Sequence, residues 1–173
     1  YFAYQGNDLV KHTLADGTFT TYTYDANHRV VTETSATGAS KTYTYSGNQI
    51  ASITHSNGLV ENFTYDASGN VLKESDNQGK NQTYLYNDNN QMIKKTYTDG
   101  TYEEWGYDGN GNITSYRDRI GGITTNAYDK NNNVIASKKG SLTNTKVYDS
   151  NNQCIKETDA QGITKTYTYD AKL

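Results

Sequence analysis

The sequence predicts an all-β fold made of tandem antiparallel β-hairpins, each about 20 or 21 residues long, in a sheet that curves. Tyrosine recurs at this interval along the whole chain, and glycine follows at a second regular position. Seventeen of the 173 residues are tyrosine, and none is proline. Thr and Tyr favour strands whereas Asn, Asp and Gly favour turns, so the composition also indicates strands joined by short turns.

The repeats are marked by the last aromatic residue before each Asp- or Asn-containing turn. Because the chain begins and ends inside a repeat, we expect residues 1–173 to be a single array of about eight repeats, and a fragment of a longer repeat protein. The markers are Tyr4, Tyr24, Tyr45, Tyr65, Tyr86, Tyr107, Tyr128, Tyr148 and Tyr169.

Each repeat contains two turns with different chemistry. The first begins directly after the marker with an Asx residue, whose side chain caps such turns, and an apolar residue follows five or six positions after the marker. The second carries a glycine, often as Asp-Gly or Asn-Gly, which is a strong hairpin signal. Two repeats lack one residue in the first turn, and the seventh is irregular near Gly140. The regular second-turn glycines are Gly38, Gly58, Gly79, Gly100, Gly121 and Gly162.

The strand that leads to each marker alternates between aromatic and polar residues. Side chains two positions apart share a face of a strand, so paired aromatics such as Tyr22 and Tyr24 should form one face and threonines such as Thr23 the other. Asn126 and Lys146 replace the first aromatic in two repeats, where the aromatic layer should thin. About sixteen successive strands are expected, and open sheets that wide curl.

The composition argues against a disordered chain, a nucleic-acid-binding protein and a membrane-spanning segment. Hydrophobic residues make up only 33% of the chain and the mean hydropathy is −0.93, but the formal charge of −3 is too small to favour disorder. Acidic and basic residues nearly balance and no run of five like charges occurs, so we expect no nucleic-acid partner. No apolar run approaches the length of a membrane-spanning helix, so we expect no membrane insertion by this segment.

The first turns resemble the YD repeat of the RHS family, whose Tyr-Asp-x-x-Gly-Asn-Val pattern is present at residues 65–71 and nearly so at 107–113. The resemblance covers essentially the whole chain. It implies a long β-ribbon that spirals into a hollow shell, which in bacterial toxin members encloses a toxic C-terminal polypeptide; the similar teneurins act in adhesion. It therefore implies flanking YD repeats and an enclosed toxin as partners, and a secreted or cell-surface location. The chain has no proline, so the Asp-Pro self-cleavage element of such toxins is missing and no catalytic residue can be transferred.

Metal and catalytic sites have weak support. Asp108, Asp129 and Asp149 begin EF-hand-like spacings, but the twelfth positions lack the bidentate Glu that calcium loops require. We therefore expect self-capped Asx turns, with no metal and no cofactor. The twelfth positions are Arg119, Gly140 and Ala160.

Isolated side chains do not suggest an enzyme either. His12, His28 and His55 lie in different contexts, without a nucleophile motif. Cys154 occupies a position that is apolar in other repeats, so we expect a small buried residue. Three glutamates recur at equivalent positions and are expected to form a solvated row: Glu33, Glu74 and Glu157.

Two functions remain. The first is a non-enzymatic wall segment of a β-shell around a toxin polypeptide. The alternative is an extracellular adhesion or carbohydrate-binding module, possibly part of a surface fibre, in which exposed rings stack on sugars. The exposure of the aromatic face discriminates between them, because rings packed inward are structural. The candidate glycan-stacking residues are Tyr22, Tyr43, Tyr84, Trp105 and Tyr167.

Overall fold

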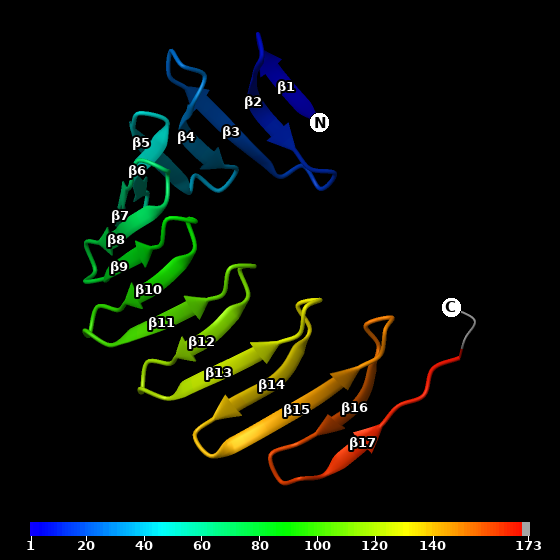
Figure 1. Cartoon of the computed structure of the whole chain (residues 1–173). Coiled ribbons are helices and arrows are strands. Elements are labelled where there is room, and N and C mark those ends of the chain that lie inside the picture. The colour runs from blue at the N-terminus through cyan, green and yellow to red at the C-terminus, as the bar shows by residue number, and fades with distance from the viewer. Residues whose placement is uncertain (171–173) are drawn as a thin grey trace. The chain divides into compact units, whose positions relative to one another are not determined.

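The computed structural model describes residues 1–170 and consists of β-strands and turns (Figure 1). None of these residues forms a helix long and apolar enough to cross a membrane. Contacts divide the chain into two compact units, residues 1–84 and 85–173. The prediction of a single array over residues 1–173 stays a prediction.

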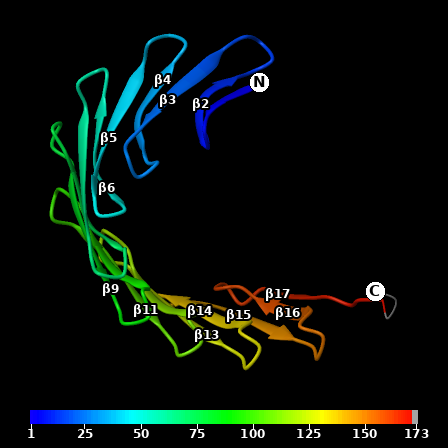
Figure 2. The same ribbon diagram turned by 90° about the horizontal axis from the view of Figure 1, so that it is seen from above.

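The first unit contains eight complete strands and the larger part of a ninth. They are β1 (Phe2–Gln5), β2 (Asp8–Thr13), β3 (Phe19–Tyr24), β4 (Val30–Ser35), β5 (Ser40–Ser46), β6 (Gln49–His55), β7 (Val60–Tyr65), β8 (Val71–Asp76) and β9 (Asn81–Tyr86). Each strand pairs antiparallel with the next, and successive strands rotate relative to one another, so the sheet of this unit curves (Figure 2).

The second unit repeats the same pattern of antiparallel hairpins. Its strands after β9 are β10 (Met92–Thr96), β11 (Tyr102–Tyr107), β12 (Ile113–Arg117), β13 (Ile123–Tyr128), β14 (Val134–Lys139), β15 (Leu142–Tyr148), β16 (Cys154–Thr158) and β17 (Thr164–Thr166). The all-β class and the tandem antiparallel hairpins are thus confirmed. Residues 1–170 form seventeen strands where about sixteen were expected, because they contain an additional half repeat.

A β-bulge lies at the marker tyrosine in the first-turn hairpins β1–β2, β3–β4, β5–β6, β7–β8, β11–β12, β13–β14 and β15–β16. Between β3 and β4, Thr23 pairs with Thr32 but Tyr24 pairs with Val30, so one extra residue of β4 is accommodated there. The same irregularity precedes Tyr45 and Tyr107. The marker and the apolar residue of its own repeat are therefore opposite each other across the bulge. The bulge was not predicted from the sequence.

The two faces of the sheet differ in side-chain size and exposure. We call the face that carries Tyr22, Tyr24, Tyr43, Tyr45 and the equivalent side chains of other repeats the Tyr face, and the opposite face the Thr face. On β5 the tyrosines are half-buried, whereas Thr42 and Thr44, which point to the opposite face, are exposed. The predicted alternation is confirmed on this strand.

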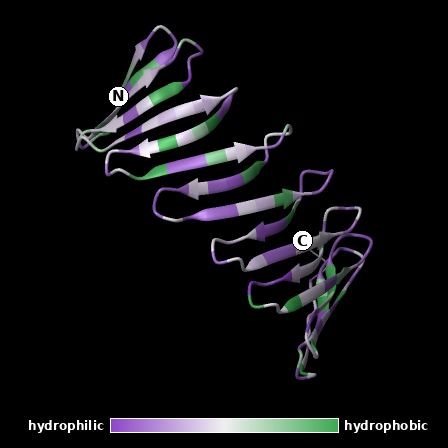
Figure 3. Cartoon of the chain, turned by 90° about the vertical axis from the view of Figure 1, so that its left-hand side faces the viewer, coloured by the Kyte–Doolittle hydropathy of each residue, from purple (hydrophilic) through white to green (hydrophobic). Residues whose placement is uncertain are grey.

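The layer on the Tyr face is one side chain thick and does not form a deep core. Tyr84, 8% exposed, is the one buried hydrophobic residue within the described range. Apolar segments are short and interspersed with polar ones along the strands (Figure 3). The expectation that Cys154 is buried is wrong, because a single layer leaves this thiol half-exposed.

The turns have the two predicted types. The shortened first turns and the irregular second turn become two-residue connections with left-handed glycines at Gly6, Gly47 and Gly140. Regular second turns also need a left-handed residue, as at Gly100, whose φ is 81°. Gly109 in a first turn has no left-handed φ, and alanine occupies the equivalent position in two other repeats, as Ala26 and Ala67.

Replacing Gly100 by alanine should lower the free energy of unfolding by about 1–2 kcal/mol, since an L-residue with a side chain is strained in the left-handed region. Gly109→Ala is the matched control, because both positions have open space for a Cβ. This change should be neutral or raise stability by up to about 1 kcal/mol. Denaturant unfolding followed by circular dichroism measures both values; equal effects would contradict the turn assignment.

Candidate functional site

The marker tyrosines connect successive repeats through their hydroxyl groups. The hydroxyl of Tyr24 donates a hydrogen bond of 2.8 Å to the backbone carbonyl of Leu9, fifteen residues earlier. Tyr45 makes the same bond, of 2.6 Å, to Val30, which is itself opposite Tyr24 across the bulge. Equivalent bonds run from Tyr65 to Ile50, Tyr107 to Met92, Tyr128 to Ile113 and Tyr169 to Cys154.

These hydrogen bonds close the hairpins at the end remote from their second turn. Between β2 and β3 the paired register runs from Thr13 opposite Phe19 only as far as Lys11 opposite Thr21. The Tyr24 hydroxyl reaches the Leu9 carbonyl beyond the last of these pairs. An otherwise open pair of strand ends is thereby joined, and the carbonyl gains a partner that the ladder does not supply.

A second set of bonds joins the first aromatic of one repeat to a glutamate of the repeat before it. Tyr43 donates to Glu33 at 2.9 Å and Tyr84 to Glu74 at 2.9 Å. Tyr167 likewise donates to Glu157 at 2.6 Å. The expectation that these glutamates form a solvated row is therefore wrong. Cross-strand pairing places Glu33 on the same face as the aromatic residues, where it can accept a phenolic hydrogen.

The second unit contains a denser version of this arrangement. The carboxylate of Glu103 accepts hydrogen bonds from both Tyr97 and Tyr116. The ring of Tyr116 lies 5.6 Å from that of Trp105, and the Arg119 guanidinium lies 3.9 Å from the centre of the Tyr97 ring. The cluster thus combines hydrogen bonds with aromatic and cation–π contacts.

These contacts shift the ionisation of the groups involved. Burial, together with the hydrogen bond to Glu33, raises the pKa of Tyr43 to about 12. The hydrogen bonds to Glu103 and Glu157 raise the pKa of Tyr116 and that of Tyr167, each to about 12. Each carboxylate favours the protonated phenol, because an ionised phenolate could not donate.

The first turns are capped by their own side chains. Asp66 accepts hydrogen bonds from the backbone N–H groups of Ser68 and Asn70, both at 2.9 Å, and from the Asn70 side chain. The Asn70 side-chain and backbone bonds lower the pKa of Asp66. The EF-hand-like turns at Asp108, Asp129 and Asp149 follow the same pattern, so their carboxylates are used as Asx caps.

Asparagine side chains also connect neighbouring first turns in the second unit. Asn132, at a φ of 65°, accepts hydrogen bonds from Asn110 and Asn112 of the preceding turn. Asn152, at a φ of 63°, accepts equivalent bonds from Asn131 and Asn133 of the turn before it, at 2.7 and 3.0 Å. This edge is therefore held by a ladder of amides that was not predicted.

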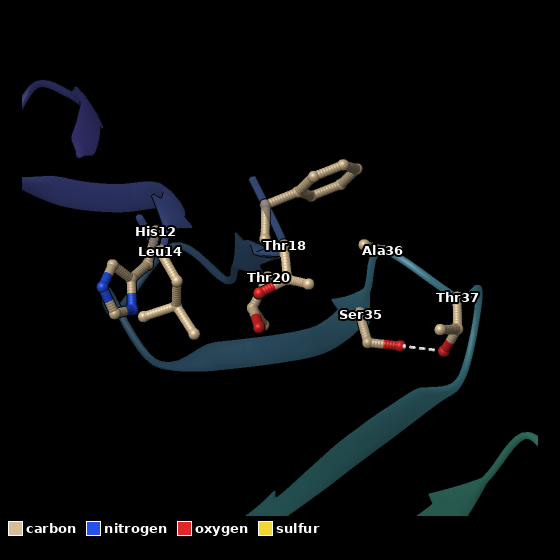
Figure 4. Close-up of a pocket in the computed structure, with 8 residues that line it drawn as sticks. His12, Leu14, Thr18, Thr20, Ser35, Ala36 and Thr37 are labelled. Carbon is tan, nitrogen blue, oxygen red and sulfur yellow. Dashed lines mark hydrogen bonds between the residues drawn. The ribbon is translucent and has the colours of Figure 1, made fainter. Parts of the chain in front are cut away.

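Shallow depressions recur near the second turns on the Tyr face. One of about 320 Å³ in the first unit is bordered by His12 of β2, Leu14 of the turn that follows it, Thr20 of β3 and Ser35 of β4 (Figure 4). Its walls are mainly aliphatic and hydroxyl groups, and Ser35 bonds to a turn threonine at 2.8 Å. His12 is the one titratable side chain in its lining, so the depression has no pair of groups suited to acid–base chemistry.

The three histidines are separated, as expected. The ring of His12 stacks on Phe2 at 4.6 Å, and His28 lies 3.0 Å from the carboxylate of Asp8. His55 lies 2.7 Å from Glu61. Across residues 1–170 the structure has no group of three His, Cys, Asp or Glu side chains arranged to hold a metal ion.

The candidate glycan-stacking residues are distributed along the Tyr face. Tyr22, Tyr43 and Trp105 are half-buried, Tyr84 is buried and Tyr167 is 38% exposed. The hydroxyls of Tyr43, Tyr84 and Tyr167 are used in the glutamate bonds described above. Four of the five rings therefore form part of the packed layer, whereas Tyr167 is exposed.

The Thr face of the first unit has a different composition. Cross-strand partners on this face include Thr23 with Thr32 and Thr44 with Ser52, whose hydroxyl groups hydrogen-bond at 2.6 Å in both pairs. From β3 to β8 the register places no carboxylate on this face. The acidic strand residues of that region lie on the Tyr face.

Tyr107→Phe should lower the free energy of unfolding by about 0.5–1.5 kcal/mol, because the Met92 carbonyl loses its phenolic donor. Tyr148→Phe is the matched control, since the Tyr148 hydroxyl has no hydrogen-bond partner within residues 1–170. Its effect should stay within about 0.5 kcal/mol. Paired denaturant titrations decide the matter, and equal losses would show that the hydroxyl bond is not the cause.

Alkaline pH should destabilise the fold between about pH 10 and 12. The unfolded tyrosines lose their protons near pH 10, whereas Tyr43, Tyr116 and Tyr167 keep theirs to about 12 when folded. Their contribution is therefore complete below pH 10 and lost as pH rises through the folded values. Tyrosinate absorbance of the folded protein should show this late titration, and Glu157→Gln should remove part of it. Titration of every tyrosine near pH 10 would refute the prediction.

The comparisons with known proteins agree with this geometry. Three solved structures are similar in fold: the Photorhabdus luminescens Tc holotoxin pore with a TccC3 mutation, TcdB2–TccC3–TEV and TcdB2–TccC3–Cdc42. Their TM-scores are 0.67, 0.70 and 0.68, at sequence identities of 19, 15 and 13%, over 86, 87 and 88% of this chain. The chain covers only 9, 9 and 10% of those chains.

A search of curated proteins finds no match. The sequence profile of the RHS repeat matches residues 4–40, 65–102 and 148–172, which together are more than half of the chain. These segments contain six of the nine marker tyrosines, together with capped Asx turns such as that at Asp66 and left-handed turn glycines such as Gly100. On this evidence, the chain belongs to the RHS repeat family.

Proposed function

We propose that this chain is a non-enzymatic wall segment of a larger extracellular RHS-repeat protein, in which it helps to enclose a toxin polypeptide. The observation that carries the proposal is the tyrosine–carbonyl bond that links a repeat to the one before it, as Tyr24, Tyr45 and Tyr65 do. A wall built in this way can extend by adding repeats, because stability comes from neighbour contacts and needs no central core. The wall would act by steric separation of the enclosed polypeptide from solvent and proteases.

The fold similarity supports the same proposal. The similar structures contain TccC3 together with TcdB2, and one is named as lacking the hypervariable C-terminal region. A segment that covers about a tenth of such a chain fits the role of one stretch of a long wall. Flanking repeats would then pair with its outer strands and remove the exposed sheet edges.

The test uses the full-length protein that contains this segment. Electron cryo-microscopy should show residues 1–170 in a continuous wall with polypeptide density on one side of it. Limited trypsin digestion should leave that polypeptide intact in the native protein and cleave it after denaturation. A segment that protrudes from the assembly, or an inner polypeptide digested as fast in the native protein as after denaturation, would exclude the wall function.

The carbohydrate-binding alternative has less support from the geometry, because the rings that would stack on sugars are packed and hydrogen-bonded. Trp105 and Tyr167 are the most informative positions to test. A glycan array should give no signal that is lost in Trp105→Ala or Tyr167→Ala. Specific binding that disappears in these variants, with unchanged unfolding midpoints, would favour the adhesion function instead.

A further inference from the structure

The Tyr face contains a gap at the repeats in which the first aromatic is missing. In two regular repeats an aromatic residue at this position pairs with a glutamate on the adjacent strand, as Tyr22 does with Glu33 and Phe63 with Glu74. In the irregular repeats Asn126 pairs with Ser137, and Lys146 pairs with Glu157. The side chains that replace the rings are shorter or more flexible, and β15 is exposed at every position except Tyr148.

The gap is a depression of about 330 Å³ on the second unit. Asn144 and Lys146 from β15 form one wall. Glu157, Ile163 and Lys165 from β16, β17 and their turn form the other. It is open to solvent and contains both a cation and an aliphatic surface, since Ile163 is 61% exposed.

The charged side chains of the depression differ in how many hydrogen bonds and ion pairs they form. Glu157 accepts the Tyr167 hydroxyl at 2.6 Å and lies 3.7 Å from the Lys165 ammonium. Asp159 caps its own turn by accepting the backbone N–H groups of Gln161 and Ile163. Lys146, although opposite Glu157, forms no ion pair with any described residue. The side-chain amide of Asn144 has no hydrogen-bond partner in residues 1–170 either.

We infer that this depression is a docking site for an extended acidic polypeptide segment in which an Asp or Glu and an apolar residue lie two positions apart. The carboxylate would bind the Lys146 ammonium and the Asn144 amide, which lie two positions apart on one face. In an extended ligand, side chains two positions apart point the same way, about 6.5–7 Å from each other. The apolar side chain two positions from the carboxylate can therefore cover Ile163 or Leu142, which is 52% exposed.

A polypeptide fits the site better than an acidic saccharide. Both offer carboxylates to Lys146, but only the polypeptide also offers apolar side chains to the exposed Ile163 and Leu142. The inference is independent of the proposed wall function, because it concerns which segment binds this face and holds for an enclosed or an external partner alike.

The site can be tested on the chain itself by fluorescence anisotropy with a labelled peptide of the repeating pattern Glu-Ser-Leu-Ser, in which Glu and Leu lie on one face when the peptide is extended. Its counterpart with Gln in place of Glu should bind about tenfold more weakly, because the charge-assisted bond is lost. Lys146→Tyr should weaken binding of the Glu peptide by a similar factor, since it removes the cation and restores the aromatic pattern that fills the gap. Added salt should weaken binding of the Glu peptide to the unchanged chain.

Lys73→Tyr is the matched control: it removes the same charge and adds the same ring at an exposed position on the Thr face of the first unit. It should bind the Glu peptide as the unchanged chain does. Lys146→Gln serves as a second variant if Lys146→Tyr alters the unfolding midpoint. Equal losses in both lysine positions, equal binding of the Gln peptide, or full competition by a uronic-acid oligosaccharide would overturn the inference.

Discussion

The structure depends on one hydrogen bond, from the hydroxyl of a marker tyrosine to a backbone carbonyl fifteen residues earlier. The bond from Tyr45 to Val30 shows why it is effective. Val30 is also the partner of Tyr24 across the β-bulge, so this bulge is held from its own repeat and from the next. A net contribution of about 1 kcal/mol is ordinary for one such bond, but each is made where the strand ladder has already ended.

This linkage explains how a chain with little apolar content can remain folded. Side chains on the Tyr face form a layer one residue thick, and Tyr84 alone among the described hydrophobic residues is buried. Hydrogen-bonded phenols, glutamates and turn caps replace the interior of a globular domain. Both faces of such a sheet are open to contact with a partner, and their chemistry differs. The Tyr face carries aromatic rings and carboxylates, while the Thr face of the first unit carries hydroxyl groups and, from β3 to β8, no carboxylates.

Departures from the repeat pattern are where a repeat protein can recognise a partner, because regular positions are occupied by the linkage itself. Tyr43 and Tyr84 have no free hydroxyl for a ligand. Around Lys146 the ring and its hydrogen bond are absent, the Tyr148 link is missing, and polar and aliphatic groups are left exposed together. A wall of such repeats can thus be held together by one repeated linkage and still present a distinct binding surface where the repeat pattern is interrupted.

The sequence alone determined the all-β class, the hairpin period, the two turn types and the face on which each aromatic lies. These follow from local chemistry, since alternation, Asx capping and left-handed glycines act over a few residues. The tertiary structure alone decided the bulge at Tyr24, the bond from Tyr45 to Val30 and the use of Glu33 as a phenol acceptor. Each of these depends on the register between strands, which brings together residues six to fifteen positions apart. Periodicity in the sequence shows that such residues recur, but only the register shows which of them are in contact.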